Sequence, residues 1–159
     1  MVRPFAKNVL NFAREADAVV TCSQSTREDL ITLADLASER VHVVYGGVEK
    51  KTRPSFSKEE IKDKLSQYYR VKHPFLLYVG TLEPRKNVLR LLRAFFQVAN
   101  QIPHQMVFVG QKGWNIDNFF ETWSRSEFRD RVILTGYVPQ SDLELFYEEA
   151  EAFLFPSLY

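Results

Sequence analysis

Two adjacent cations, Arg85 and Lys86, stand shortly after a glycine that ends an apolar run in the stretch YVGTLEPRKN, residues 78–87. An arginine guanidinium holds a phosphate with a fork of donors, whereas a lysine ammonium acts as a point charge. Gly80 would let the backbone approach a ligand closely, and the N-terminus of the helix that follows would offer unpaired N–H groups. This combination predicts a local phosphate site.

Context decides between this prediction and the simpler alternative that the two cations are merely solvated. In an open α/β sheet, ligands bind in the crevice at the carboxyl ends of the strands. Two further glycine loops follow apolar runs, at Gly110 and at Gly136. Gly110 could add donors to the site, although turn formation alone would explain it. Neither GxxxxGK[ST] nor GxGxxG occurs, which argues against a nucleotide hydrolase and a nicotinamide enzyme.

The elements that must position these loops alternate along the second half of the chain. Near-continuous apolar runs of this kind are typical of parallel strands covered on both faces, and they occupy residues 75–80, 106–110, 132–136 and 152–157. Helical spacing separates them, with predicted helices after Asn87 as N-cap, over 114–129, and from Ser141, where Ser141 and Glu144 form a capping-box pattern. The order predicts an α/β fold with a doubly wound parallel sheet.

The first third of the chain repeats this alternation more weakly. Its predicted elements are a helix at 2–15, a strand at 18–22, a helix at 25–37 opened by Ser25 and Glu28, and a strand at 41–45. The residues that follow are polar and contain a helix that begins at Ser57. We therefore predict the end of one domain over residues 1–48, a connector over 49–73, and the first half of a second domain over 74–159.

Composition excludes several classes of function. The 159 residues are 45% hydrophobic and carry a formal charge of +1, so no global field favours nucleic acid as a partner. The single cysteine, Cys22, precludes an internal disulfide, and no apolar run is long enough to span a bilayer. The three histidines are far apart in sequence, so no metal site is expected. We expect a cytoplasmic protein.

The motifs YVGTLEPRKN, MVFVG and VILTGYVPQSDLELFYEEAEAFLFPSLY, in this order, resemble the donor-binding half of retaining glycosyltransferases with two Rossmann-like domains. This GT-B class includes glycosyltransferase family 4, also described as glycosyl transferases group 1. Residues 75–159 carry the likeness, and residues 16–49, with TCSQSTREDL and VVYGGVE, resemble the end of the acceptor domain. The resemblance implies an incomplete Rossmann-like donor domain preceded by the end of a first one.

The resemblance also implies a reaction: transfer of a hexose, of the mannose or glucose type, from a GDP- or UDP-linked donor to a sugar or glycan, with retention. No cofactor or metal is implied, so protein cations and helix N-termini would neutralise the leaving diphosphate. Lys86 matches the family's phosphate-binding lysine. Thr81 stands where many members have an arginine, and Arg85 is its expected substitute. Gly136, Tyr137 and Val138 match the part that reads the base, with Leu143 beside the nucleotide.

Family members continue beyond a PSLY-like segment with two glutamates that hold the donor sugar and ribose. We therefore expect a fragment truncated at both ends, whose catalytic residues are unknown and which is inactive alone. The parent protein's association with a membrane stays open. Two alternatives remain: a non-catalytic nucleotide-sugar-binding or interaction module, and a two-domain sugar-nucleotide epimerase, which would act without an acceptor.

Overall fold

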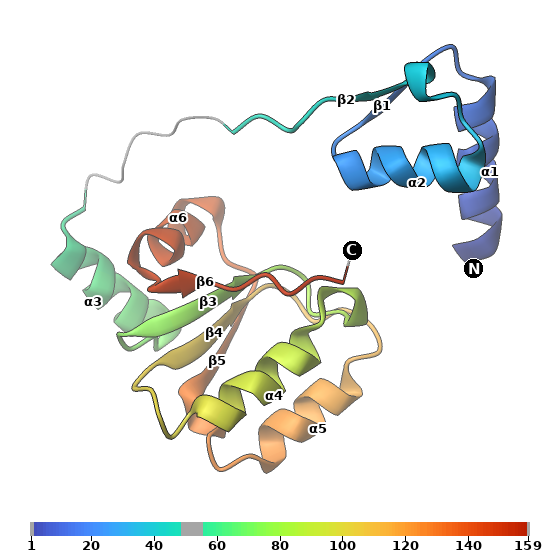
Figure 1. Cartoon of the computed structure of the whole chain (residues 1–159). Coiled ribbons are helices and arrows are strands. Elements are labelled where there is room, and N and C mark those ends of the chain that lie inside the picture. The colour runs from blue at the N-terminus through green and yellow to red at the C-terminus, as the bar shows by residue number, and fades with distance from the viewer. Residues whose placement is uncertain (1, 49–55, 159) are drawn as a thin grey trace. The chain divides into compact units, whose positions relative to one another are not determined.

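The computed structural model describes residues 2–48 and 56–158 (Figure 1). The chain divides into two compact units, Met1–Thr52 and Arg53–Tyr159. Within the described residues, no helix is both long and apolar enough to cross a membrane.

The first unit contains a short parallel pair of strands with helices beside it. Its elements are α1 (Val2–Glu15), β1 (Val19–Thr21), α2 (Gln24–Ala34), the 3-10 turn η1 (Ser38–Arg40) and β2 (Val41–Val43). The predicted start of the second helix at Ser25 is wrong, because Ser23 is the N-cap and its hydroxyl accepts from the N–H of Thr26. That helix ends at Ala34 because the next residue, Asp35, is left-handed, with a φ of 56°.

The second unit is a four-stranded parallel sheet in the order β5-β4-β3-β6. Its elements are α3 (Lys58–Tyr69), β3 (Phe75–Val79), the 3-10 turn η2 (Pro84–Lys86), α4 (Val88–Val98), β4 (Gln105–Val109), α5 (Asp117–Arg125), the 3-10 turn η3 (Arg129–Arg131), β5 (Val132–Gly136), α6 (Gln140–Glu149) and β6 (Ala152–Phe153). The predicted doubly wound α/β fold is confirmed.

Helices cover both faces of this sheet. Tyr78, on β3, packs with α4 and α5 in one hydrophobic cluster. Leu77, the preceding residue, packs with α3 and α6 in the other (Figure 1). Successive side chains of a strand point to opposite faces, so a strand covered on both sides must be apolar throughout. This explains the near-continuous apolar runs in the sequence.

Helix α3 belongs to the core of the second unit, although it falls within the predicted connector 49–73. Its buried residues Ile61 and Leu65 pack in the same cluster as Phe146 of α6. The second unit therefore includes residues before the predicted boundary at 74. Residues 49–55 of that connector lie outside the described part of the chain.

The last helix of this unit begins differently from its prediction. Helix α6 starts at Gln140 with Pro139 in the N-cap position, and no side chain caps it. The carbonyl of Pro139 already accepts from the N–H groups of Asp142 and Leu143, so Ser141 lies inside the first turn. The predicted capping box of Ser141 and Glu144 is therefore wrong.

Two other predicted elements differ from the structure by more than two residues at one end or both. The helix expected over 114–129 is confined to Asp117–Arg125, and the strand expected over 152–157 is paired only at Ala152–Phe153. Beyond that short strand, the N–H of Leu154 still donates to the carbonyl of Leu77, but Pro156 has no N–H to continue a ladder.

The strand order creates a switch point beside β3. From β3 the chain moves outward through β4 to β5, and α6 then returns it to β6 on the other side of β3. The segments that leave β3 and β6 therefore begin side by side at the carboxyl edge of the sheet. This is where doubly wound folds bind ligands.

Candidate functional site

The loops after β3, β4 and β5 are joined by backbone hydrogen bonds. Gly80 donates to the carbonyl of Val109 at 2.8 Å, and Gly110 donates to that of Gly136 at 2.9 Å. Farther out, Leu82 donates to the carbonyl of Gln111 at 2.9 Å. The three glycine loops predicted from sequence therefore form one connected rim along the carboxyl edge of the sheet.

Gly110 is required by its neighbouring loop. A Cβ atom at this position would lie 2.1 Å from the carbonyl oxygen of Gly80, and its φ is +144°. Glycine is therefore needed at position 110 because the loops after β3 and β4 approach each other closely there. At Gly136, with a φ of +71°, a Cβ atom would have no neighbouring atom within 4 Å, so there only the backbone conformation calls for glycine.

A cavity of about 390 Å³ opens at this rim. Backbone-rich loops and the first turn of α6 surround it. Its lining consists of Val79, Gly80, Thr81, Val109, Gly110, Gln111, Tyr137, Val138, Gln140 and Leu143. Six of the nine residues predicted to bind donor are therefore brought together here: Gly80, Thr81, Gly110, Tyr137, Val138 and Leu143.

Two neighbouring residues after β5 differ in their burial. Val138 is buried in the cluster that contains α3 and α6, which fixes the loop to the core. Tyr137, in contrast, is 71% exposed, so its ring is accessible beside the cavity. Gln111 and Gln140 also line the cavity and were not predicted. The sequence signal that could have identified them was their position: Gln111 directly follows Gly110 after β4, and Gln140 directly follows Pro139 at the start of α6.

The first turn of α6 is held by α3. Asp142 accepts from Lys64 at 2.7 Å and from the Tyr69 hydroxyl at 2.6 Å. The hydrogen bond from Lys64, followed by that from Tyr69, lowers the pKa of Asp142. Burial, together with the bond to Asp142, raises the pKa of Tyr69 to about 12, so the phenol remains a donor at neutral pH. Leu143, which lines the cavity, is thereby positioned by its neighbour.

The predicted phosphate-binding cations lie on the 3-10 turn η2 and do not line the cavity. Helix α4 does not follow β3 directly, because residues 80–87, which contain this turn, lie between them. Arg85 forms an ion pair with Glu83 at 2.7 Å, and Glu83 is only 4% exposed. Burial, and then the charge of Glu83, raise the pKa of Tyr78 to about 12. The ion pair with Glu83 therefore places a buried carboxylate against the guanidinium of Arg85, which partly neutralises its charge.

Lys86 has a different environment on the same turn. Its Nζ lies 4.8 Å from the centroid of the Phe155 ring, in the segment that follows β6. Within the described part of the chain, Lys86 forms no ion pair with a carboxylate. An aromatic ring attracts an ammonium without cancelling its charge. Lys86 therefore keeps a full positive charge at the switch point.

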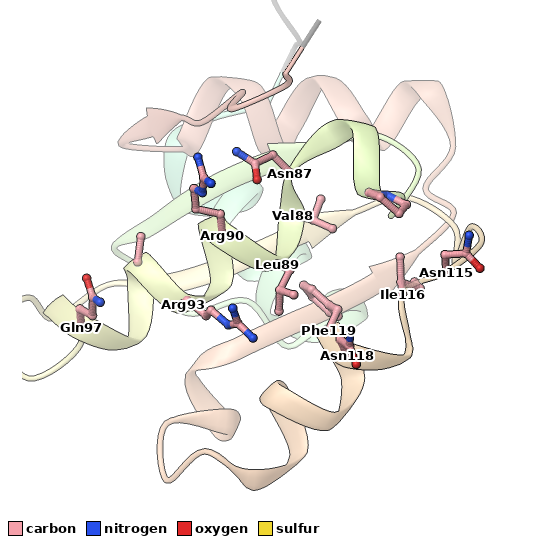
Figure 2. Close-up of a pocket in the computed structure, with 12 residues that line it drawn as sticks. Asn87, Val88, Leu89, Arg90, Arg93, Gln97, Asn115, Ile116, Asn118 and Phe119 are labelled. Carbon is pink, nitrogen blue, oxygen red and sulfur yellow. The ribbon is translucent and has the colours of Figure 1, made fainter.

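A larger cavity, of about 560 Å³, lies in the groove between α4 and α5. Figure 2 shows Arg93 on α4 extending toward α5, with Asn115 and Asn118 near the start of α5, whereas Arg90 extends to the other side of α4. This groove runs between the outer surfaces of two helices and contains none of the glycine loops. The cavity at the carboxyl edge of the sheet is the stronger candidate because open α/β sheets bind ligands there.

Metal ligands are a separate question. Searching the described residues, we find no group of three or more His, Cys, Asp or Glu side chains arranged to hold a metal ion.

A doubly wound parallel sheet with a glycine-rimmed cavity at its switch-point edge defines a Rossmann-like class of α/β domain. Residues 57–159 match the family model of glycosyl transferases group 1, and residues 1–51 match that of glycosyltransferase family 4. The chain belongs to the glycosyl transferases group 1.

The relatives of this chain include mannosyltransferases. The O-antigen chain mannosyltransferase B of Escherichia coli is 28% identical over 99% of this chain and 42% of its own length. A serotype-specific mannosyltransferase, WbdA, of the same species is 30% identical over 99% of this chain and 20% of its own. This chain thus spans less than half the length of these relatives.

Solved structures share the fold. The Anabaena HepE protein in complex with UDP-glucose has a TM-score of 0.76 and 22% identity, over 95% of this chain and 41% of that one. WaaG, a glycosyltransferase of lipopolysaccharide biosynthesis, has a TM-score of 0.69 and 18% identity, over 87% and 38%. These similarities identify a GT-B glycosyltransferase fold.

Proposed function

We propose that the second unit binds the diphosphate and nucleoside of a GDP- or UDP-linked hexose, of the mannose or glucose type. In the whole protein this unit serves a retaining hexosyltransferase whose acceptor is a sugar or glycan. The observation that carries the proposal is the cavity at the switch-point edge, where six of the residues predicted to bind the donor converge. The mannosyltransferase relatives and the UDP-glucose complex of HepE support the same class of donor.

The residues of this site have distinct roles in the proposal. The rim of glycine loops and the exposed ring of Tyr137 receive the nucleoside, and Leu143 contributes an apolar wall. Lys86 and Arg85 lie on the turn that leaves β3 and face the negative charge that develops on the departing diphosphate. Fixed cations of this kind stabilise a transition state electrostatically without a metal or other cofactor.

Isothermal titration of the 159-residue chain with UDP and with GDP tests the proposal. We expect binding of one nucleotide more tightly than the other, which also identifies the base. The Lys86→Ala variant loses a charge-assisted contact, and we expect its dissociation constant to rise about 10- to 150-fold.

Lys72→Ala is the matched control. Lys72 is exposed and precedes β3, at the opposite edge of the sheet, so its loss should leave affinity unchanged. Circular dichroism should show both variants folded. Absence of binding to either nucleotide, or equal affinity of the wild type and Lys86→Ala, would contradict the proposal.

A further inference from the structure

The segment after β6 is attached to the turn that carries Lys86, although the two are about 70 residues apart in sequence. The side-chain amide of Asn87 donates to the carbonyl of Pro156 at 3.2 Å. The N–H of Leu158 donates to the carbonyl of Arg85 at 3.1 Å. Together with the ring of Phe155 over Lys86, these contacts join the loops on the two sides of the switch point.

Asn87 contributes through its backbone as well as its side chain. Its φ is 58°, in the left-handed region, and its side chain makes no capping bond to α4 (Figure 2 shows it at the start of that helix). The left-handed turn ends η2 and directs the amide toward Pro156. Asparagine is among the few residues other than glycine that adopt this conformation readily.

We propose that Asn87 and Phe155 are positioning residues for Lys86: the amide attaches the loop after β6 to the turn, and the ring then holds the ammonium in place for a diphosphate. This inference rests on the proposed function of Lys86 as a phosphate ligand. It adds that the loop after β6 takes part in the site through an aromatic ring.

The physical reason is preorganisation of a flexible cation. A lysine side chain loses considerable rotamer freedom when it is fixed, which weakens any contact it makes. A carboxylate partner would fix it but would also cancel its charge. The ring of Phe155 restricts the ammonium and leaves its charge available. Arg85, paired with the buried Glu83, illustrates the other arrangement on the same turn.

Exposure makes the ring suitable for mutation. Phe155 is 53% exposed, so a leucine there retains apolar bulk without opening a cavity. Phe56 offers a matched control, because it is 51% exposed and Lys64 Nζ lies 5.6 Å from its ring centroid. Phe56 therefore presents the same residue type in the same kind of contact, a lysine ammonium beside a phenylalanine ring, but with a lysine of α3.

The test is a double-mutant cycle in the 159-residue chain, measured by titration with whichever of UDP and GDP binds the wild type more tightly. We expect Phe155→Leu to weaken binding about two- to fivefold and Phe155→Tyr to restore it, since tyrosine keeps the ring. In the Lys86→Ala background, Phe155→Leu should have no further effect. Phe56→Leu should bind as the wild type does.

Asn87→Gly separates the amide from the backbone, because glycine keeps the left-handed turn at no steric cost. We expect it to weaken binding about two- to tenfold. If Lys86→Ala weakens binding but Phe155→Leu and Asn87→Gly bind as the wild type does, the positioning role is overturned while the proposed function survives. If Phe155→Leu weakens binding equally with and without Lys86, the ring acts independently of the lysine and the inference is again overturned. Failure of the wild type to bind either nucleotide would instead overturn the proposed function.

Discussion

Lys64 Nζ lies 2.7 Å from Asp142 Oδ1, an ion pair that joins α3 to the first turn of α6. The other oxygen of the same carboxylate accepts from the Tyr69 hydroxyl. Both oxygens of Asp142 are thus used by one helix, and the residue that follows, Leu143, lines the cavity at the carboxyl edge of the sheet. A helix that lies in the predicted connector therefore positions one wall of the candidate site.

Replacing this carboxylate should lower stability. Asp142→Asn retains the size of the side chain but loses the charge that Lys64 faces, and we expect the free energy of unfolding to fall by about 1.5–3 kcal/mol. Urea unfolding followed by circular dichroism measures it. Asp63→Asn, an exposed carboxylate on the same helix, is the control and should change stability by less than about 0.5 kcal/mol. Equal effects of the two variants would show that the ion pair contributes nothing.

The contribution of Asp142 should also depend on pH. Its pKa is lowered from the ordinary value of 3.8, chiefly by the hydrogen bond from Lys64. A carboxylate with a depressed folded-state pKa stabilises the protein fully above its unfolded pKa, and this stability is lost as pH falls through the folded pKa. The stability difference between the wild type and Asp142→Asn should therefore be constant near neutrality and shrink below about pH 4. Paired urea titrations from neutral to acidic pH measure it, and a difference that persists undiminished in strong acid would refute the assignment.

Gly110→Ala should be destabilising because two causes act together. The new methyl group would lie 2.1 Å from the carbonyl oxygen of Gly80, and the φ of +144° is one that alanine rarely adopts. We expect a loss of at least about 1–3 kcal/mol, seen as a lower urea midpoint. Gly47→Ala is the control, since nothing lies within 4 Å of its Cβ position. If Gly110→Ala were as stable as that control, the close approach of the two loops would not be a structural requirement.

Arg131 should resist replacement by lysine. Its guanidinium donates to the carbonyls of Ala99, Ile102 and His104, which lie at the end of α4 and in the loop that follows. Lysine has the same charge but lacks the planar fork of donors, so we expect Arg131→Lys to cost about 1.5–3 kcal/mol. Thermal and urea unfolding both report it. Arg129→Lys, at an exposed arginine in the same 3-10 turn, should be nearly neutral, and the proposed role fails if the two variants behave alike.

Much of the second unit could be predicted from local pattern. Apolar runs that end in glycine identified β3, β4 and β5 to within a residue or so, because a strand buried on both faces must be apolar at nearly every position. The same pattern placed the three glycine loops at one edge of the sheet, since the carboxyl ends of parallel strands lie together. The residues predicted to bind the donor are these glycines or follow them, and six of them line one cavity.

Helix starts were predicted less well because several residues compete for one cap. Ser23 and Ser25 both suit an N-cap, and the structure uses Ser23. At α6 the serine of the expected capping box lies inside a helix that Pro139 has already begun. Local sequence contains both possibilities, and packing of the helix against its neighbours selects one.

Contacts between distant segments depended on the tertiary structure alone. Nothing near Lys86 in the sequence indicates Phe155, and nothing near Asp142 indicates Lys64. Lys86 and Phe155 meet because α6 returns the chain to the side of β3 opposite β4, so that the loops after β3 and β6 become neighbours. The local pattern therefore determined which residues form strands, loops and candidate ligands, whereas the order of the strands decided that the ring of Phe155 lies beside Lys86.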